Sequence, residues 1–303
     1  MTFTPITAED YPRLKPFFRA QAYRLCAYGL PVVIAWQNDN YHPVAHIDGD
    51  TLWIGADFKS TPEYRHLILP VPADGDHDPE TLARLARTND FDQYWFVPEC
   101  YVNTWGADLI RRFFRLNRQK EYDDYVYRTR DLAELKGNRY AKKRNLINQF
   151  TAAYVETGRT KIEPISDTNA DACAVFLERW CDIMSCGSDT KNDLACEKIA
   201  ALSTLTNIGR FNVRGMAIRI DGDICAFGIG SDLTDDMGGL HFEKAYPDIK
   251  GLYQYLDTLC ARELFKDVAF INKASDMGIP GLAKAKRSYH PVEMVKSYRL
   301  TLK

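Results

Sequence analysis

The chain has 303 residues, of which 46% are hydrophobic and 26% charged, with 39 basic against 41 acidic side chains. This length favours two domains over one small core, and the composition excludes disordered, collagen-like and coiled-coil proteins. Because the net charge is close to zero, the molecule as a whole has no electrostatic field that would attract nucleic acid. The longest apolar run, residues 29–36, is too short to span a bilayer.

The first residues have neither the basic start nor the apolar stretch of a secretory signal, so we expect a cytoplasmic protein without a transmembrane segment. The eight cysteines are scattered and form no C-x-x-C pair, which indicates free, mostly buried thiols. His42 and His46 are four residues apart, but Pro43 lies between them, so they do not share a helix face. We therefore expect no metal site.

In chain order, residues 9–28 are predicted to be a helix, because apolar side chains recur at spacings of three and four. Short strands are predicted at 31–36, 51–54, 66–69 and 94–97, and helices at 79–87 and 108–116. A strand over 122–128 is expected to close this first lobe. We assign the lobe to residues 1–135.

The second lobe, residues 136–303, is predicted to begin with a long linking helix, 138–157. A strand at 161–165 precedes two helices, one carrying Cys173 to Met184 and one at 194–205. Strands at 211–220 and 224–230 are joined by Asp221-Gly222-Asp223, which predicts a hairpin. Five further elements are predicted in the rest of the chain: a strand at 239–245, a helix at 251–265, a strand at 268–272, a helix at 279–287 and a final strand at 292–300.

The element order of the second lobe, β-α-α-β-β-β-α-β-α-β, is that of the GCN5-related N-acetyltransferase (GNAT) fold. We expect its strands 239–245 and 268–272 to run parallel and to separate at their ends. Acetyltransferases of this fold bind the pyrophosphate of coenzyme A at a glycine-rich turn before a helix. Here the corresponding turn keeps Gly251. However, Asp248 stands where a cation or an amide is required, and Tyr253 stands where a small residue is required. Coenzyme A binding in the usual way is therefore disfavoured.

Three stretches are similar to one known family: residues 142–150, residues 241–245 with 251–254, and residues 271–291. They resemble the family named for the C-terminal domain of phosphatidylglycerol lysyltransferase. The resemblance implies an α/β protein of two tandem GNAT-like lobes, each a mixed twisted sheet flanked by helices. It also implies transfer of an aminoacyl group from charged tRNA to a lipid head group. The chain departs from the family pattern at Lys273, where arginine is expected, and at Ala274, Ser275 and Ala283.

Candidate catalytic residues lie at the ends of two predicted strands. Glu243 would orient or deprotonate the acceptor, and Lys244 or Lys273 would stabilise the tetrahedral oxyanion. An ion pair between Glu243 and Lys244 at the strand end is the alternative. Candidate substrate-binding residues are Asn272, Asp276, Tyr253, Gln254, Lys284 and Lys286. For Asp276, capping of the following helix is equally compatible with the sequence.

A basic segment precedes and enters the linking helix: residues 111–144 contain twelve Lys or Arg and five Asp or Glu. The candidate nucleic-acid-binding residues in it are Arg139, Lys142, Lys143 and Arg144. They could neutralise tRNA phosphates, or they could form the solvated face at the start of a helix.

The favoured function is that of an acyltransferase that uses aminoacyl-tRNA, with a lipid head group or a soluble molecule as acceptor and no cofactor. Its expected partners are tRNA and membrane lipid at the cytoplasmic surface, which places it in the cytoplasm and peripheral to the membrane. One alternative is an acyl-CoA-dependent N-acyltransferase. The other is a non-catalytic module that binds RNA, a lipid surface or another protein without turnover.

Overall fold

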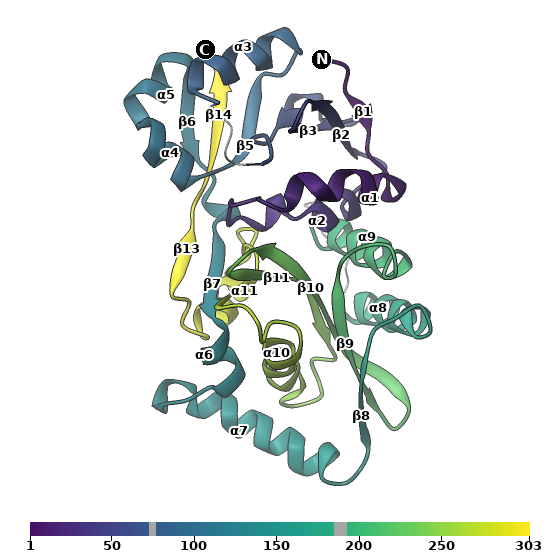
Figure 1. The fold of residues 1–303 in the computed structure, drawn as a ribbon. Coiled ribbons are helices and arrows are strands. Elements are labelled where there is room, and N and C mark those ends of the chain that lie inside the picture. Colours follow the sequence, from purple (N-terminus) through teal and green to yellow (C-terminus); the bar gives the residue numbers. More distant parts are fainter. Residues whose placement is uncertain (73–76, 185–192) are drawn as a thin grey trace.

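The computed structural model describes residues 1–72, 77–184 and 193–303, which form two mixed sheets flanked by helices (Figure 1). The predicted α/β class, with two GNAT-like lobes, is confirmed. Cys186 and the turn predicted at 74–76 lie outside the described residues. In the described part of the chain, no helix combines the length and apolar character needed to cross a membrane.

Within these residues, the first sheet has seven strands in the order β1-β2-β3-β4-β5-β14-β6. Its strands are β1 (Thr4–Pro5), β2 (Tyr41–Asp48), β3 (Thr51–Phe58), β4 (His66–Leu67), β5 (Gln93–Pro98), β6 (Phe114–Arg118) and β14 (Ser297–Leu302). The helices around it are α1 (Tyr11–Leu14), α2 (Leu30–Ala35), α3 (Pro79–Thr88), α4 (Glu99–Trp105) and α5 (Ala107–Phe113).

The second sheet, counted in the same way, has seven strands in the order β13-β7-β12-β11-β10-β9-β8 among the described residues. Its strands are β7 (Asp124–Arg128), β8 (Thr160–Pro164), β9 (Arg214–Ile220), β10 (Asp223–Thr234), β11 (Met237–Ala245), β12 (Phe270–Asn272) and β13 (Glu293–Val295). Its helices are α6 (Thr129–Glu134), α7 (Ala141–Phe150), α8 (Ala170–Met184), α9 (Asp193–Thr206), α10 (Leu252–Glu263) and α11 (Pro280–Arg287).

The two sheets exchange strands. β7, which we expected to close the first lobe, pairs with β12 and β13 in the second sheet. β14, which we expected to end the second lobe, lies between β5 and β6 in the first sheet (Figure 1). The boundary placed at residue 135 therefore does not separate the sheets. Strand periodicity in a sequence identifies a strand but not its partner, which here is more than 140 residues away.

Three predicted elements of the first lobe are corrected. The helix predicted over 108–116 ends at Phe113, and the residues that follow begin strand β6. The helix predicted over 9–28 is broken into α1 and 3-10 turns at Ala8–Asp10, Lys15–Phe18 and Cys26–Tyr28, because Pro12 and Pro16 each lack a backbone N–H. The run at 31–36, predicted as a strand, is helix α2. Pro31 suits the first turn of a helix, and a short continuous apolar run does not distinguish the two structures.

The elements of the second lobe follow the prediction closely. The linking helix consists of a 3-10 turn (Asn138–Tyr140), α7, and a π-helical turn (Thr151–Val155). The predicted hairpin joins β9 to β10 through Asp221 and Gly222, whose φ angles of 53° and 98° are those required for a tight hairpin turn.

Strands β11 and β12 run parallel, as predicted, and their pairing ends with β12 at Asn272. They pair at Met237–Phe270, Gly238–Ile271 and Gly239–Asn272 only. Just beyond, β11 contains a bulge at His241, since Ile229 and Gly230 of β10 pair with Phe242 and Leu240. A bulge bends its strand. It also shifts the alternation of side chains, so that Glu243 faces α10 and Lys244 faces α8.

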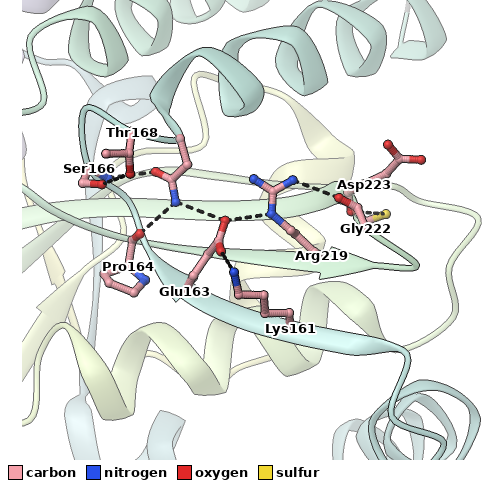
Figure 2. Close-up of polar contacts among 10 residues, drawn as sticks. Lys161, Glu163, Pro164, Ser166, Thr168, Arg219, Gly222 and Asp223 are labelled. Carbon is pink, nitrogen blue, oxygen red and sulfur yellow. Dashed lines mark hydrogen bonds and ion pairs between the residues drawn. The ribbon is translucent and has the colours of Figure 1, made fainter.

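An ionic network joins β8 and β9 on the second sheet, and Figure 2 shows Glu163 at its centre. Glu163 is 2.7 Å from the Lys161 ammonium and accepts hydrogen bonds from Arg219 (2.8 Å) and Asn169 (3.1 Å). Lys161, followed by Arg219, lowers the pKa of the Glu163 carboxyl from 4.5 to about 2, against the opposing effect of burial.

Replacing Glu163 by Gln is expected to lower the free energy of unfolding by about 1 kcal/mol near neutral pH, a figure reduced for solvent screening around the exposed Lys161. The folded pKa lies below the unfolded value, so the stabilisation is present above pH 4.5 and is lost as the pH falls towards 2. Urea unfolding of both proteins should show the difference shrinking between about pH 7 and about pH 3. Glu156→Gln, at an exposed site, is the control, and an undiminished difference at acid pH would contradict the assignment.

Candidate active site

Three ionic side chains from separate elements meet where β11 leaves β12. Lys273, directly after β12, places its ammonium 2.8 Å from Glu243 at the end of β11 and 2.9 Å from Asp257 on α10. The exposed fractions of the three side chains are 10%, 17% and 2% respectively. The space where the pairing of β11 and β12 ends is thus occupied by a buried cluster of one ammonium and two carboxylates.

The electrostatics of this cluster favour a charged Lys273 and a basic Glu243. Burial alone would lower the pKa of Lys273, but the charges of Asp257 and Glu243 outweigh it and hold that pKa well above its usual value. Burial, followed by repulsion from Asp257, raises the pKa of Glu243. Oδ1 of Asp257 has no hydrogen-bond partner among the described residues. The cluster therefore holds one ammonium between two carboxyl groups.

Tyr289 and Lys143 cover the cluster. The ring centroid of Tyr289 lies 5.2 Å from the Lys273 ammonium and 3.8 Å from that of Lys143 on α7. Lys143 also donates a 2.7 Å hydrogen bond to Ser288 Oγ, and burial lowers its pKa. Helix α7 therefore forms part of the wall around Glu243 and Lys273.

The turn before α10 is packed against α7. Gly251 has a φ angle of 87°, and a Cβ atom added there would lie 2.1 Å from the carbonyl oxygen of Leu146. Glycine is required both for the backbone conformation and for this close approach. At the position corresponding to the pyrophosphate turn of acetyltransferases, the backbone of α7 lies against Gly251.

Lys244 lies apart from Glu243 and Lys273. Its ammonium is 2.7 Å from Glu197 of α9 and 4.4 Å from the ring centroid of Trp180 on α8. The strand-end ion pair between Glu243 and Lys244 is therefore not formed, because the two side chains point to opposite faces of β11. Of the two candidate lysines, only Lys273 contacts Glu243.

Asn272 and Asp276 are occupied by structural contacts. The buried Asn272 amide donates to the carbonyl of Arg24 (2.7 Å) and to Asp124 (2.9 Å), which ties β12 to the first lobe. Asp276 accepts hydrogen bonds from the Gly278 N–H (2.9 Å) and the Tyr125 hydroxyl (2.6 Å). It stabilises the turn before α11 rather than the amides of the helix itself.

The remaining candidate substrate-binding residues make no observed contact with the ionic groups of Glu243, Lys273 and Asp257. Lys286 is half-buried and donates hydrogen bonds to the carbonyls of residues 273–275, so it fixes the backbone that carries Lys273. Burial, with repulsion from Lys273, lowers the pKa of Lys286 to about 8. Lys284 is exposed, and Tyr253 and Gln254 are half-buried at the start of α10. Burial raises the pKa of Tyr253 to about 12.

The basic residues of the linking helix differ in their surroundings. Arg139 pairs with Asp131 at 2.9 Å, and Arg144 donates hydrogen bonds to the carbonyls of Leu135 and Gly137, just after α6. Lys143 covers Tyr289, whereas Lys142 is exposed. Three of these four side chains therefore already have partners within the chain.

Sequence reasoning missed Asp257, which completes the cluster. Its signal was a carboxylate on the apolar face of a predicted helix, beside Leu256, Cys260 and Ala261. Acidic residues are rarely fully buried unless they are paired, so this position indicated a buried cation nearby.

The fold, two mixed sheets with parallel central strands in the second sheet, is that of the GNAT acyltransferase type. The family described as phosphatidylglycerol lysyltransferase, C-terminal, matches residues 34–301. The chain belongs to this family.

Solved structures are similar over the full chain. A conserved protein of unknown function from Bacteroides thetaiotaomicron is 26% identical, covers 100% of both chains and has a TM-score of 0.89. The C-terminal domain of a putative lysylphosphatidylglycerol synthetase from Agrobacterium fabrum is 14% identical, with a TM-score of 0.65 over 97% of this chain and 92% of its own. FemX is 9% identical, with a TM-score of 0.58 over 100% and 96%. The latter two likenesses show the fold.

A curated relative is the uncharacterized protein MYCGA3080 of Mycoplasmoides gallisepticum, 25% identical over 177 residues. The match covers 58% of this chain and 54% of that protein, so the chain spans about half the length of this relative.

Proposed function

We propose that this protein is an acyltransferase that moves an aminoacyl group from charged tRNA to a lipid head group or a soluble acceptor. The observation that carries the proposal is the Glu243–Lys273 pair, 2.8 Å apart, in the space where the pairing of β11 and β12 ends. The family of the chain supports the same reaction class.

In the proposed reaction, the hydroxyl or amine of the acceptor attacks the carbonyl carbon of the aminoacyl ester. Glu243 accepts the proton of the acceptor, and its raised pKa makes it a stronger base than an ordinary carboxylate. Lys273 stabilises the oxyanion of the tetrahedral intermediate. The ester C–O bond then breaks, and the proton held by Glu243 passes to the leaving tRNA oxygen. Tyr289 and Lys143 must move aside for the acyl group to reach the pair.

Two features support tRNA over coenzyme A as the donor. The turn at Gly251 is packed against α7, which leaves its backbone less accessible to a pyrophosphate. The basic segment supplies cations near the linking helix. Because Lys142 is exposed, we propose that it contacts a tRNA phosphate.

The test is a transfer assay with the parent protein. Radiolabelled amino acids on a panel of tRNAs, and labelled acetyl-CoA, are offered with lipid vesicles and with soluble amines and alcohols. Label is expected to move from tRNA to one acceptor class and not from acetyl-CoA. Transfer from acetyl-CoA alone would show that coenzyme A, and not tRNA, carries the acyl group. Binding of charged tRNA without transfer to any acceptor would favour the binding-module alternative.

A further inference from the structure

The turn that carries Lys273, residues 273–277, follows β12 and is closed around a single side chain. The ammonium of Lys286, on α11, donates hydrogen bonds to the carbonyl oxygens of Lys273, Ala274 (3.1 Å) and Ser275 (2.6 Å). An ammonium has three N–H donors, so each donor is used by one carbonyl of this turn. Three successive carbonyl groups therefore point at one positive charge.

This convergence requires backbone conformations that are rare for residues with a side chain. Ala274 and Met277 have φ angles of 54° and 52°, which lie in the left-handed region. Carbonyl oxygens also repel one another when they are brought together, and a cation among them offsets that repulsion. Hydrogen bonds from a charged donor are stronger than neutral ones. The conformation of the turn therefore depends on the charge of Lys286.

The N–H groups of the turn are bound on its other side. Lys273 N–H donates to the carbonyl of Tyr125 on β7 (2.9 Å), and Ala274 N–H donates to Oδ1 of Asn272 (2.7 Å). These bonds attach the turn to the second sheet, whereas Lys286 draws its carbonyl groups together.

The position of the turn decides where the Lys273 ammonium lies. Lys273 reaches carboxylates on two other elements, Glu243 of β11 at 2.8 Å and Asp257 of α10 at 2.9 Å. Both distances depend on where the backbone of Lys273 is held. Within the described residues, Lys286 is paired with neither carboxylate, so its hydrogen bonds act on Lys273 through the backbone.

We propose that Lys286 is a positioning residue for acyl transfer, which holds the 273–277 turn in the conformation that places the Lys273 ammonium beside Glu243. Its three donors are already bound to carbonyl groups, so none is left for a substrate. The expected effect on the transfer rate rests on the proposed function, whereas the effect on the turn does not.

The first measurement is amide hydrogen exchange of the Lys273 and Ala274 N–H groups, followed by NMR in the parent and in Lys286→Ala. Both groups are hydrogen-bonded in the closed turn, so their exchange reports its opening. Exchange is expected to be at least about tenfold faster in Lys286→Ala. Lys266→Ala, an exposed change ahead of β12, is the control and should exchange at the parental rate.

The second measurement separates the charge of Lys286 from its packing. Propylammonium chloride supplies the methylene groups and the ammonium that Lys286→Ala removes, and it should restore slow exchange. Propanol with sodium chloride supplies the same apolar chain without its charge, and it should not.

The third measurement is the transfer assay. Lys286→Ala should lower kcat by up to about a hundredfold with KM for the donor unchanged, because a misplaced oxyanion-stabilising group slows the chemical step. A rise in KM without a fall in kcat would instead show that Lys286 contacts the donor, and the positioning role would be rejected.

Parental exchange in Lys286→Ala, or equal rescue by propanol, would also overturn the proposal. If Lys286→Ala does not fold, Lys286→Met keeps the apolar stem and removes the ammonium, and parental exchange in that variant has the same meaning. If the parent protein transfers nothing, the proposed function fails, and the exchange rates still decide whether Lys286 holds the turn.

Discussion

Replacing Glu243 by Gln is expected to slow aminoacyl transfer by about a hundred- to thousand-fold, while donor binding and melting temperature change little. The amide keeps the shape of the side chain and can still accept a hydrogen bond from Lys273, 2.8 Å from Glu243. It cannot accept the proton of the acceptor. The loss should therefore appear in kcat rather than in the affinity for the donor.

The measurement is the rate of label transfer under single-turnover conditions, with the melting temperature recorded for each variant. Glu263→Gln, an exposed change at the end of the same helix that carries Asp257, is the matched control and should transfer at the parental rate. Parental transfer by Glu243→Gln would remove Glu243 from the mechanism while leaving the fold assignment intact.

Replacing Lys273 by Met should lower the free energy of unfolding by about 3–5 kcal/mol at neutral pH, because it leaves two buried carboxylates without their shared cation. Glu243 and Asp257 would then repel one another in a region almost excluded from water. The pKa of at least one carboxyl would be raised in the folded protein above its unfolded value. The loss of stability is therefore greatest at pH values above that raised pKa, and it becomes smaller as the pH falls through it.

Urea unfolding as a function of pH measures this effect. Adding Glu243→Gln to Lys273→Met should restore part of the lost stability, and the two changes should be strongly non-additive. Lys284→Met, at an exposed position on α11, is the control. A loss that is the same at every pH, and is unaffected by Glu243→Gln, would show that packing rather than charge determines the stability contribution of Lys273.

Much of the second lobe could be predicted from the sequence, because its signals are local. The apolar stripes of α7 and α10 and the hairpin at Asp221–Gly222 each depend on residues within a few positions of one another. The positions of Glu243 and Lys273 at strand ends followed from the same element order. In the first lobe, Pro12, Pro16 and the run at 31–36 left the local signals ambiguous, and there the predictions were wrong.

Only the tertiary structure decided which strands share a sheet and which side chains share a site. β7 and β14 exchange between the lobes because their pairing partners are distant in sequence, and strand periodicity does not specify a partner. The bulge at His241 turns Glu243 towards Lys273 and Asp257 and turns Lys244 away, and one inserted residue leaves no periodic signal. The sequence by itself thus determined the family and the local elements, through interactions between near neighbours. The ionic cluster depends on contacts between β11, α10 and the turn after β12, which form only when the chain is folded.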